Sequence, residues 1–331
     1  MESVKRQRVR SGLAEVSAED RELMSRRSVL FEGVKQAAEF YGRRPRRFEL
    51  HADIASAPRS AKQLYFVRHG EGFHNAWRKV EQAAGRKPMA KRHNMKEVPG
   101  ELHDPCLTPR GEQDANDAAV KASNLPSPEL LVTSPMRRAV QTMFTAFAPA
   151  VDAGVPAVAH ELCREAFHGL DPSIYDSRLS RDALAKAFPR VDFSRFVLPS
   201  EASLDTAGGT VVIDDPLWWH CTSPFGHCEG GIHEAAIVEH AYQFLCWLMS
   251  RPEQVIAVAT HSNFLLALYH GCLSVAGGGA HAEPQVFHTG ELRAVALVER
   301  SAHAVHEPKE RLQTSARLRE WGGMLSGSGT C

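Results

Sequence analysis

Residues 64–71 read Leu64-Tyr65-Phe66-Val67-Arg68-His69-Gly70-Glu71, an apolar run that ends in an arginine, a histidine and a glycine. Such a run predicts a buried strand that delivers a basic pair to the edge of a sheet. The glycine would let a ligand approach the backbone closely. A basic pair at this place suits a bound anion, but it also suits a strand end that faces water, so the rest of the chain must decide.

Between about residues 60 and 300, strand-like segments alternate with helix-like ones. This alternation predicts an α/β fold, with a doubly wound, mostly parallel sheet flanked by helices on both faces. The predicted strands are residues 63–67, 130–133, 157–160, 254–260 and 292–298. Thr108-Pro109 and Ser134-Pro135 each join a helix-capping residue to a first-turn proline, so we expect helices after both pairs. A further helix is predicted by the apolar face of Ile237, Ala241, Phe244, Leu245 and Leu248.

The chain divides into three predicted parts. Residues 1–58 form a polar, arginine-rich N-terminal extension that is partly helical over 30–40, and residues 301–331 form a polar tail. Residues 59–300 form the predicted main domain. Within it, residues 166–231 are rich in proline, glycine, serine and aspartate and lack clean periodicity, which predicts a lid-like insertion.

Composition excludes some classes of protein. The chain has 39 basic and 39 acidic side chains, which disfavours a nucleic-acid partner. No apolar run is long enough for a membrane span, and the N-terminus lacks the apolar core of a secretory signal. Seven cysteines, an odd number, are typical of reduced thiols. We therefore expect a cytoplasmic protein, with a mitochondrial leader in the arginine-rich extension as the open alternative.

Ionisable side chains follow four of the predicted strands. Arg68 and His69 follow the first, Arg138 lies one turn into the helix after the second, Glu165 follows the third, and His261 follows the fourth. The carboxyl ends of parallel strands share one edge of a sheet, so we expect these side chains to converge. An imidazole can act as nucleophile, arginines can hold phosphate oxygens, and a carboxylic acid can protonate a leaving oxygen. This inventory predicts phosphoryl transfer.

The same residues lie in ordered blocks that resemble a known family. The blocks are Arg68-His69-Gly70-Glu71, Asp104-Pro105-Cys106-Leu107-Thr108-Pro109-Arg110-Gly111, Ser134-Pro135-Met136-Arg137-Arg138, Leu162-Cys163-Arg164-Glu165, Phe188-Pro189-Arg190-Val191-Asp192-Phe193-Ser194 and Thr260-His261-Ser262. Together they are similar to the signature of the histidine phosphatase (phosphoglycerate mutase-like) superfamily, branch 1, over about residues 60–300. The stretch from Arg68 to Asn75 looks especially like the eukaryotic and fungal phosphatase-like members.

The resemblance implies a role for each site residue. His69 would be phosphorylated transiently, and Arg68, Asn75, Arg138, His261 and Ser262 would bind the phosphoryl group. Glu165, four residues before Gly169 as in the family pattern, would be the general acid and then the base, in preference to Glu161 and Glu71. The second histidine is followed by Ser262-Asn263 rather than aspartate, which resembles the branch of mutases and small-molecule phosphatases.

Three functions stay open at this point. The chain lacks the Ser and Trp-Asn of cofactor-dependent mutases in the first block, so we predict a phosphatase that hydrolyses a phosphomonoester through a phosphohistidine. The first alternative is a phosphoglycerate mutase-type phosphotransferase, and the second is an inactive pseudo-phosphatase that binds phosphorylated ligands. The expected partner is a phosphorylated small molecule, or else a phosphoprotein, and no cofactor is implied.

A histidine–cysteine cluster lies within the predicted lid. His220-Cys221 and His227-Cys228, with His233 nearby, contain zinc-ligand residue types. However, neighbouring residues on an extended chain point to opposite faces, which disfavours a shared ion. We therefore predict no metal site, and we expect Trp218, Trp219 and His220 to cover or line the substrate pocket.

Overall fold

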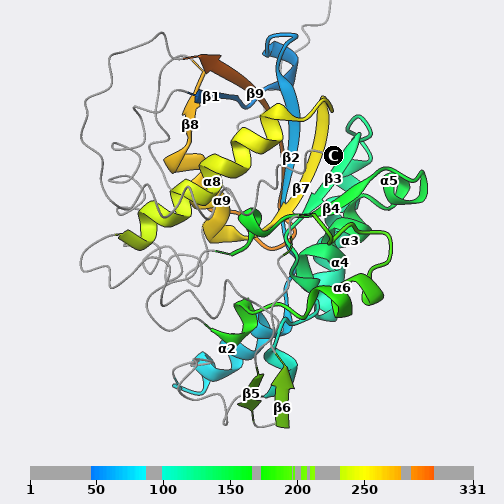
Figure 1. The fold of residues 1–331 in the computed structure, drawn as a ribbon, viewed down its shortest axis with the longest axis vertical. Coiled ribbons are helices and arrows are strands. Elements are labelled where there is room, and N and C mark those ends of the chain that lie inside the picture. The colour runs from blue at the N-terminus through cyan, green and yellow to red at the C-terminus, as the bar shows by residue number, and fades with distance from the viewer. Residues whose placement is uncertain are drawn as a thin grey trace, which may run out of the picture.

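The computed structural model describes residues 46–86, 99–165, 173–195, 197, 203–206, 209–212, 232–276 and 285–301. Their main feature is a seven-stranded sheet with the strand order β4-β3-β7-β2-β9-β1-β8 (Figure 1). The strands are β1 Arg46–His51, β2 Lys62–Arg68, β3 Leu130–Thr133, β4 Ala157–Ala159, β7 Val255–Thr260, β8 Leu273–Val275 and β9 Leu292–Ser301. A separate hairpin joins β5 Ser203–Thr206 to β6 Gly209–Val212.

The sheet is mixed but mostly parallel. Neighbours β4, β3, β7 and β2 all pair in parallel, and so do β1 and β8. Strand β9 is antiparallel to both of its neighbours, β2 and β1. The predicted α/β fold with a mostly parallel sheet is therefore confirmed.

Helices cover both faces of this sheet (Figure 1). One face carries α8 Ile232–Ser250 and α9 Ser262–Gly271, and the other carries α3 Pro109–Ala122 and α4 Arg137–Ala146. The remaining helices are α2 Phe73–Ala83, α5 Ala148–Asp152 and α6 Arg181–Ala187. Short 3₁₀ turns are η1 Ile54–Ser56, η3 Gly100–Leu102, η4 Glu161–Cys163 and η5 Ile174–Asp176.

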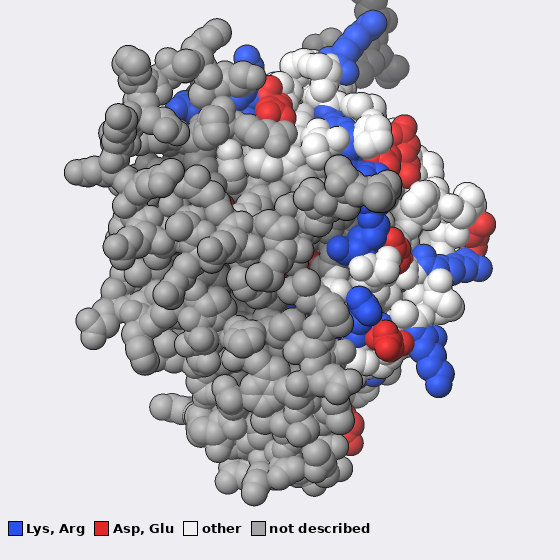
Figure 2. All heavy atoms as spheres, in the orientation of Figure 1, with Lys and Arg blue, Asp and Glu red and all other residues white. Residues whose placement is uncertain are grey.

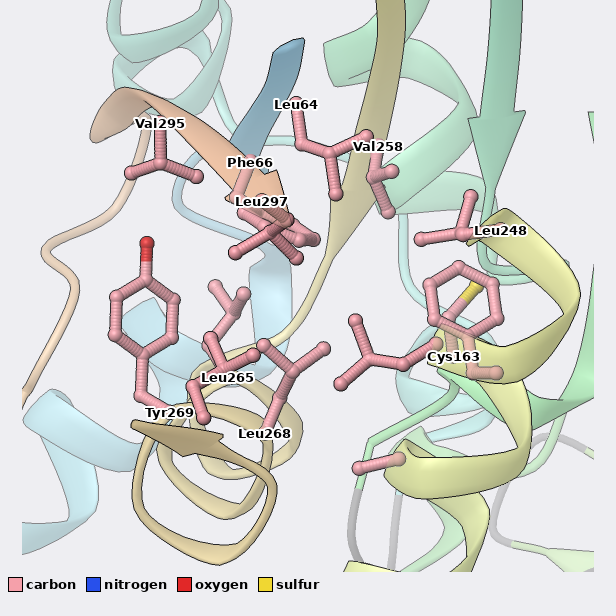
Figure 3. Packing of buried hydrophobic residues seen from close by; sticks show 14 of the residues in the cluster. Leu64, Phe66, Cys163, Leu248, Val258, Leu265, Leu268, Tyr269, Val295 and Leu297 are labelled. Atoms are coloured by element: carbon pink, nitrogen blue, oxygen red, sulfur yellow. The ribbon is translucent and has the colours of Figure 1, made fainter. Parts of the chain in front are cut away.

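Alternate residues of each central strand enter opposite cores. In β2, Leu64 and Phe66 pack toward α8 and α9, whereas Tyr65 and Val67 pack toward α4. Figure 3 shows the first core, where Leu64, Phe66 and Val258 from the strands face α9 side chains such as Leu268. Because both faces of the strand are buried, its sequence is continuously apolar rather than alternating.

The sheet includes two strands, β1 and β8, that the periodicity did not predict. Strand β1 lies inside the segment 1–58 that we assigned to an N-terminal extension, yet it pairs with both β8 and β9. Its sequence, Arg46-Arg47-Phe48-Glu49-Leu50-His51, alternates polar with apolar residues, and Phe48 and Leu50 are buried. The boundary expected near residue 58 therefore lies after a strand of the sheet. The helix expected over residues 30–40 and the tail from residue 302 lie outside the described residues.

Two local predictions differ from the structure. Helix α3 begins at Pro109 with Thr108 as its N-cap, as the sequence indicates, but α4 is capped by Met136 rather than by Ser134. The hydroxyl group of Ser134 instead contacts His261. The predicted lid also contributes to the core, because Leu184, Val191 and Phe193 are buried against the α4 side of the sheet.

Charge on the described part of the surface is mixed. Figure 2 shows lysine and arginine side chains interspersed with aspartate and glutamate on the side of the sheet that carries α3 to α6. This distribution agrees with the equal numbers of basic and acidic residues. In the part of the chain that the structure describes, no helix combines the length and the apolar character needed to cross a membrane.

Candidate active site

The predicted site residues gather at the carboxyl ends of the parallel strands. Main-chain hydrogen bonds extend the pairing one residue beyond the strands: His69 N donates to Thr260 O (3.0 Å), Ser134 N to Ala259 O (2.9 Å) and His160 N to Thr133 O (2.9 Å). These bonds fix the first residue of each loop relative to its neighbour. The loops after β2, β3, β4 and β7 therefore start from a rigid edge.

His69 lies directly after β2 and is buried. Its Nδ1 atom is 2.7 Å from the carbonyl oxygen of Gly70, and a carbonyl oxygen only accepts, so Nδ1 carries the proton and Nε2 the lone pair. Burial, followed by the charges of Arg138 and Arg68, holds the pKa of His69 well below 6.5. The ring is therefore neutral near pH 7, as a nucleophile must be.

The second histidine, His261, follows β7 and caps the N-terminus of α9. Its ring centroid is 5.0 Å from that of His69, with the two rings inclined at 61°. Nε2 of His261 contacts Ser134 Oγ at 2.8 Å, while its buried Nδ1 has no hydrogen-bond partner among the described residues. Burial and then the charge of Arg138 hold the pKa of His261 well below 6.5. This neutral ring has one nitrogen left for a ligand.

Glu165 contacts the same helix end. Its Oε1 atom accepts hydrogen bonds from Asn263 N (3.1 Å) and Phe264 N (3.2 Å), in the first turn of α9. A carboxylate is favoured there because the first amide groups of a helix lack partners within the helix. These contacts hold Glu165 against Asn263, which comes two positions after His261 in the chain. The following residues, 166–172, are outside the described part of the chain.

Two arginines approach the histidines from different elements. Arg68 ends β2, and its Nη1 donates to Phe287 O at 2.6 Å. Arg138, in the first turn of α4, is 1% exposed and donates to Tyr175 O (2.6 Å) and Asp176 Oδ1 (3.1 Å). Its buried Nε–H has no hydrogen-bond partner among the described residues. The guanidinium group therefore still has a donor to offer to an anion.

The two remaining predicted residues lie at helix N-termini. Asn75 is the third residue of α2, and its Oδ1 accepts from Gly72 N at 2.9 Å, so the amide nitrogen is the end left to donate to a ligand. Ser262 is the first residue of α9 and is buried, and its Oγ has no partner in the described part of the structure. Both helix ends are suited to an anion.

His74 is a further site residue that the sequence reasoning did not single out. Its ring lies 5.7 Å from that of His69 and stacks on Tyr175, with 5.0 Å between centroids and 27° between planes. It is buried, and its Nδ1 has no partner among the described residues. The sequence signal was present, since His74 comes five residues after His69 and shortly after a glycine. A Cβ atom at Gly72 would lie 2.7 Å from Nδ1 of His74.

The other nearby carboxylates have structural partners. Glu161 is fully buried between Arg178 (2.8 Å) and Arg164 (3.2 Å). Glu71 binds Lys79 (3.0 Å) and accepts a hydrogen bond from Thr108 Oγ1 (2.9 Å). Arg137 also has a structural role, because it donates to the carbonyl oxygens of Asp104 and His103. Glu161 and Glu71 therefore both serve as partners of basic side chains.

Metal-ligand groupings are absent from the described ranges: no cluster of three or more histidine, cysteine, aspartate or glutamate side chains is arranged to hold an ion. The candidate cluster of His220, Cys221, His227 and Cys228 lies outside the described residues, as do Trp218 and Trp219.

Residues 64–179 match the family model described as the histidine phosphatase superfamily (branch 1). The match includes His69, Arg138 and Glu165 and ends before His261. This part of the chain is therefore similar to the histidine phosphatase superfamily.

Two proteins of Arabidopsis thaliana are similar in sequence to this chain. A phosphoglycerate mutase-like protein is 28% identical over 244 residues, which cover 65% of this chain and 75% of the relative. Phosphoglycerate mutase-like protein 1 is 26% identical over 275 residues, covering 72% of this chain and 82% of the relative. The superfamily includes both phosphatases and mutases, so the similarity leaves the type of reaction to be argued.

Solved structures with a similar chain course include two phosphatases. One is a putative alpha-ribazole-5'-P phosphatase from Escherichia coli, with a TM-score of 0.39, 17% identity, and coverage of 74% of this chain and 97% of that one. The other is the ecdysone phosphate phosphatase of Bombix mori in complex with tungstate, with a TM-score of 0.42, 14% identity, and coverage of 77% and 99%.

Proposed function

We propose that the protein is a phosphatase that hydrolyses a phosphomonoester through a phosphohistidine at His69. The observation that carries the proposal is the state of this ring. His69 is buried and neutral, its Nδ1 proton is held by Gly70 O, and its Nε2 lone pair is left for attack. Two arginine side chains, Arg138 and Arg68, lie close enough for their charges to lower the pKa of His69, and both can balance the charge of a phosphoryl group.

In the first step, Nε2 of His69 attacks phosphorus and the bond from phosphorus to the ester oxygen breaks. Arg68, Arg138 and His261 hold the three non-reacting oxygens, with Asn75 and Ser262 as further donors. Protonated Glu165 gives its proton to the leaving oxygen, which departs as an alcohol. The products of this step are the alcohol and a phosphorylated His69.

In the second step, a water molecule attacks phosphorus and the bond from phosphorus to Nε2 breaks. Glu165, now a carboxylate, takes a proton from the water, so both the acid and the histidine return to their starting states. Inorganic phosphate leaves. A mutase would run the same first step but pass the phosphoryl group to a second substrate hydroxyl instead of to water.

The decisive experiment compares the wild-type protein with His69→Ala for release of phosphate from an aryl phosphate. We expect release by the wild type and a loss of at least about a thousandfold in the variant, because the nucleophile is missing. His51→Ala is the control, since His51 lies on β1 and is separated from β2 by β9. Equal background release by all three proteins would contradict the phosphatase and favour a module that only binds phosphorylated ligands.

A trapping experiment separates hydrolysis from transfer. Brief incubation with ³²P-labelled substrate followed by denaturation in alkali, where phosphohistidine is stable, is expected to label the wild type and not His69→Ala. A phosphatase releases labelled inorganic phosphate without any added alcohol as a phosphoryl acceptor. With labelled phosphoglycerate as the substrate, formation of labelled phosphoglycerate isomers without release of phosphate would identify the mutase instead.

A further inference from the structure

The 3₁₀ turn η5, Ile174–Asp176, contacts the candidate site at two points. Arg138 donates from Nη1 to the carbonyl oxygen of Tyr175 (2.6 Å) and from Nη2 to the carboxylate of Asp176 (3.1 Å). The Tyr175 ring stacks on His74. One short turn therefore holds an arginine and a histidine that both lie beside His69.

A network of buried ion pairs also holds this turn in place. Arg164 donates from Nη2 to the carbonyl oxygen of Asp176 at 2.6 Å, and also pairs with Glu161 at 3.2 Å. Glu161 pairs in addition with Arg178, two residues beyond Asp176, at 2.8 Å. All three side chains of this network are at most 3% exposed. The backbone of the turn is thus fixed on both sides of the Asp176 carboxylate.

The geometry of Arg138 shows what the turn leaves available. A guanidinium group has five N–H donors in one plane, and the turn uses one on each terminal nitrogen. The Nε–H, which lies on a different edge of that plane, has no hydrogen-bond partner in the described residues. A planar group held along one edge has its other edge oriented, and such an edge matches two phosphate oxygens.

The charge of Arg138 also indicates that Asp176 holds the guanidinium group in place. Arg138 and Arg68 are both buried, and the charges of both lower the pKa of His69. A buried cation without a counter-charge is strongly destabilised. The Asp176 carboxylate supplies that counter-charge at Nη2 of Arg138. The carboxylate therefore keeps the guanidinium in the site when no phosphate is bound.

We propose that Asp176 is a positioning residue, which orients the guanidinium of Arg138 so that its Nε edge receives the phosphoryl oxygens. The inference rests on the proposed function, because it assigns Arg138 to the phosphoryl group. The opposite role is that the Asp176 carboxylate occupies the place of a phosphate and competes with it. The two roles predict opposite changes when the carboxylate is removed.

The test is a double-mutant cycle on the full chain. Asp176→Ala, Arg138→Ala and the double variant are compared with wild type for kcat and KM on p-nitrophenyl phosphate and for binding of orthovanadate, measured by calorimetry. For a positioning residue, Asp176→Ala lowers kcat/KM and vanadate affinity by about tenfold to a hundredfold, the size typical of outer groups that orient a ligand-binding group. In the Arg138→Ala background the same substitution has no further effect, and Asp176→Asn recovers part of the loss through its amide oxygen.

Asp182→Ala removes an acid that is 95% exposed at the start of α6, and it is expected to match wild type. An equal loss in both backgrounds, no loss, or tighter vanadate binding by Asp176→Ala would overturn the positioning role. If Asp176→Ala fails to fold by circular dichroism, the near-isosteric Asp176→Asn takes its place in the cycle. A wild type that neither releases phosphate nor binds vanadate would overturn the proposed function and this inference together, whereas an active wild type with an unaffected Asp176→Ala would overturn the inference alone.

Discussion

The hydroxyl oxygen of Ser134 lies 2.8 Å from Nε2 of His261. These residues are 127 positions apart, and they meet because β3 and β7 pair in parallel and each ends at the same edge of the sheet. The contact fixes the plane of the His261 ring. It also explains why Ser134 is not the cap of α4, since its side chain points to His261.

Ser134→Ala is therefore expected to affect catalysis more than folding. A neutral hydrogen bond contributes about 1 kcal/mol net, so we expect kcat/KM for p-nitrophenyl phosphate to fall by about three- to tenfold with little change in melting temperature. The matched control is Ser123→Ala at the exposed end of α3, where the hydroxyl group donates to Val120 O. A loss of stability without a kinetic change would show that the contact only supports the fold.

The two glutamates of the loop after β4 are expected to behave differently. Glu165→Gln keeps an oxygen for the amide groups of Asn263 and Phe264 but has no proton to give, so kcat should fall by about a hundredfold or more while vanadate still binds. Glu161→Gln leaves the buried Arg164 and Arg178 without a full counter-charge, and it should cost about 3–5 kcal/mol of folding stability. Steady-state kinetics and denaturant unfolding of both variants check the assignment, which is reversed if Glu161→Gln is stable and inactive.

His74 offers a test of whether the third imidazole binds the phosphoryl group. His74→Phe preserves an aromatic ring against Tyr175 and removes both ring nitrogens. If Nδ1 donates to or accepts from the bound group, the variant loses about tenfold in vanadate affinity, as expected for one buried hydrogen bond to a charged ligand. Tyr175→Phe keeps the stack and serves as the control. Unchanged vanadate affinity in His74→Phe would limit His74 to packing.

The backbone of Gly70 packs against that of Gly111 in α3, so neither position has room for a side chain. A Cβ at Gly111 would lie 2.0 Å from Glu71 O, and one at Gly70 would lie 2.2 Å from Gly111 O. Gly111→Ala should therefore force the loop that carries His69 away from α3 and destabilise the fold by about 3 kcal/mol or more. In Gly271→Ala the atoms nearest to the new Cβ belong to the side chain of Val238 rather than to backbone, at 2.6 Å and beyond, so the loss should be smaller. Thermal unfolding compares the two.

Buried histidines make stability depend on pH in a definite direction. Burial lowers the pKa of His160 to about 3, while in the unfolded chain the pKa is near 6.5. Below pH 6.5 the unfolded chain takes up a proton that the folded chain does not, so stability is complete above pH 6.5 and falls as the pH is lowered. For His160 alone the loss at pH 5 is about 2 kcal/mol.

His160→Asn tests this linkage. An asparagine oxygen can replace Nδ1 of His160 as the acceptor for Leu162 N, which preserves the cap of η4. The variant should be less stable than wild type at pH 7, because ring contacts with Phe244 and Trp247 are lost, but its stability should fall less steeply between pH 7 and 5. Urea unfolding at several pH values measures the slopes, and parallel slopes would contradict the assignment.

Much of the architecture could be predicted because its physical cause is local in sequence. The run from Leu64 to Val67 is apolar on both faces of a strand, and this pattern alone requires a sheet covered on both sides. The ionisable residues that follow four parallel strands must then share one edge, which brings His69, Arg138, Glu165 and His261 to one region. Strand β1 was not predicted because its polar residues alternate with only two buried apolar residues, Phe48 and Leu50.

The sequence by itself thus determined the fold class and the residue types at the site, since both follow from periodicity and from chain order. Only the tertiary structure decided how each side chain is held. The contact of Ser134 with His261 and the hydrogen bond between Arg138 and Asp176 depend on distances between segments that are 127 and 38 positions apart in the chain. Hydrogen bonds and ion pairs are sensitive to differences in distance of a few tenths of an ångström. Packing of the whole sheet edge sets these distances, and no single segment does so alone.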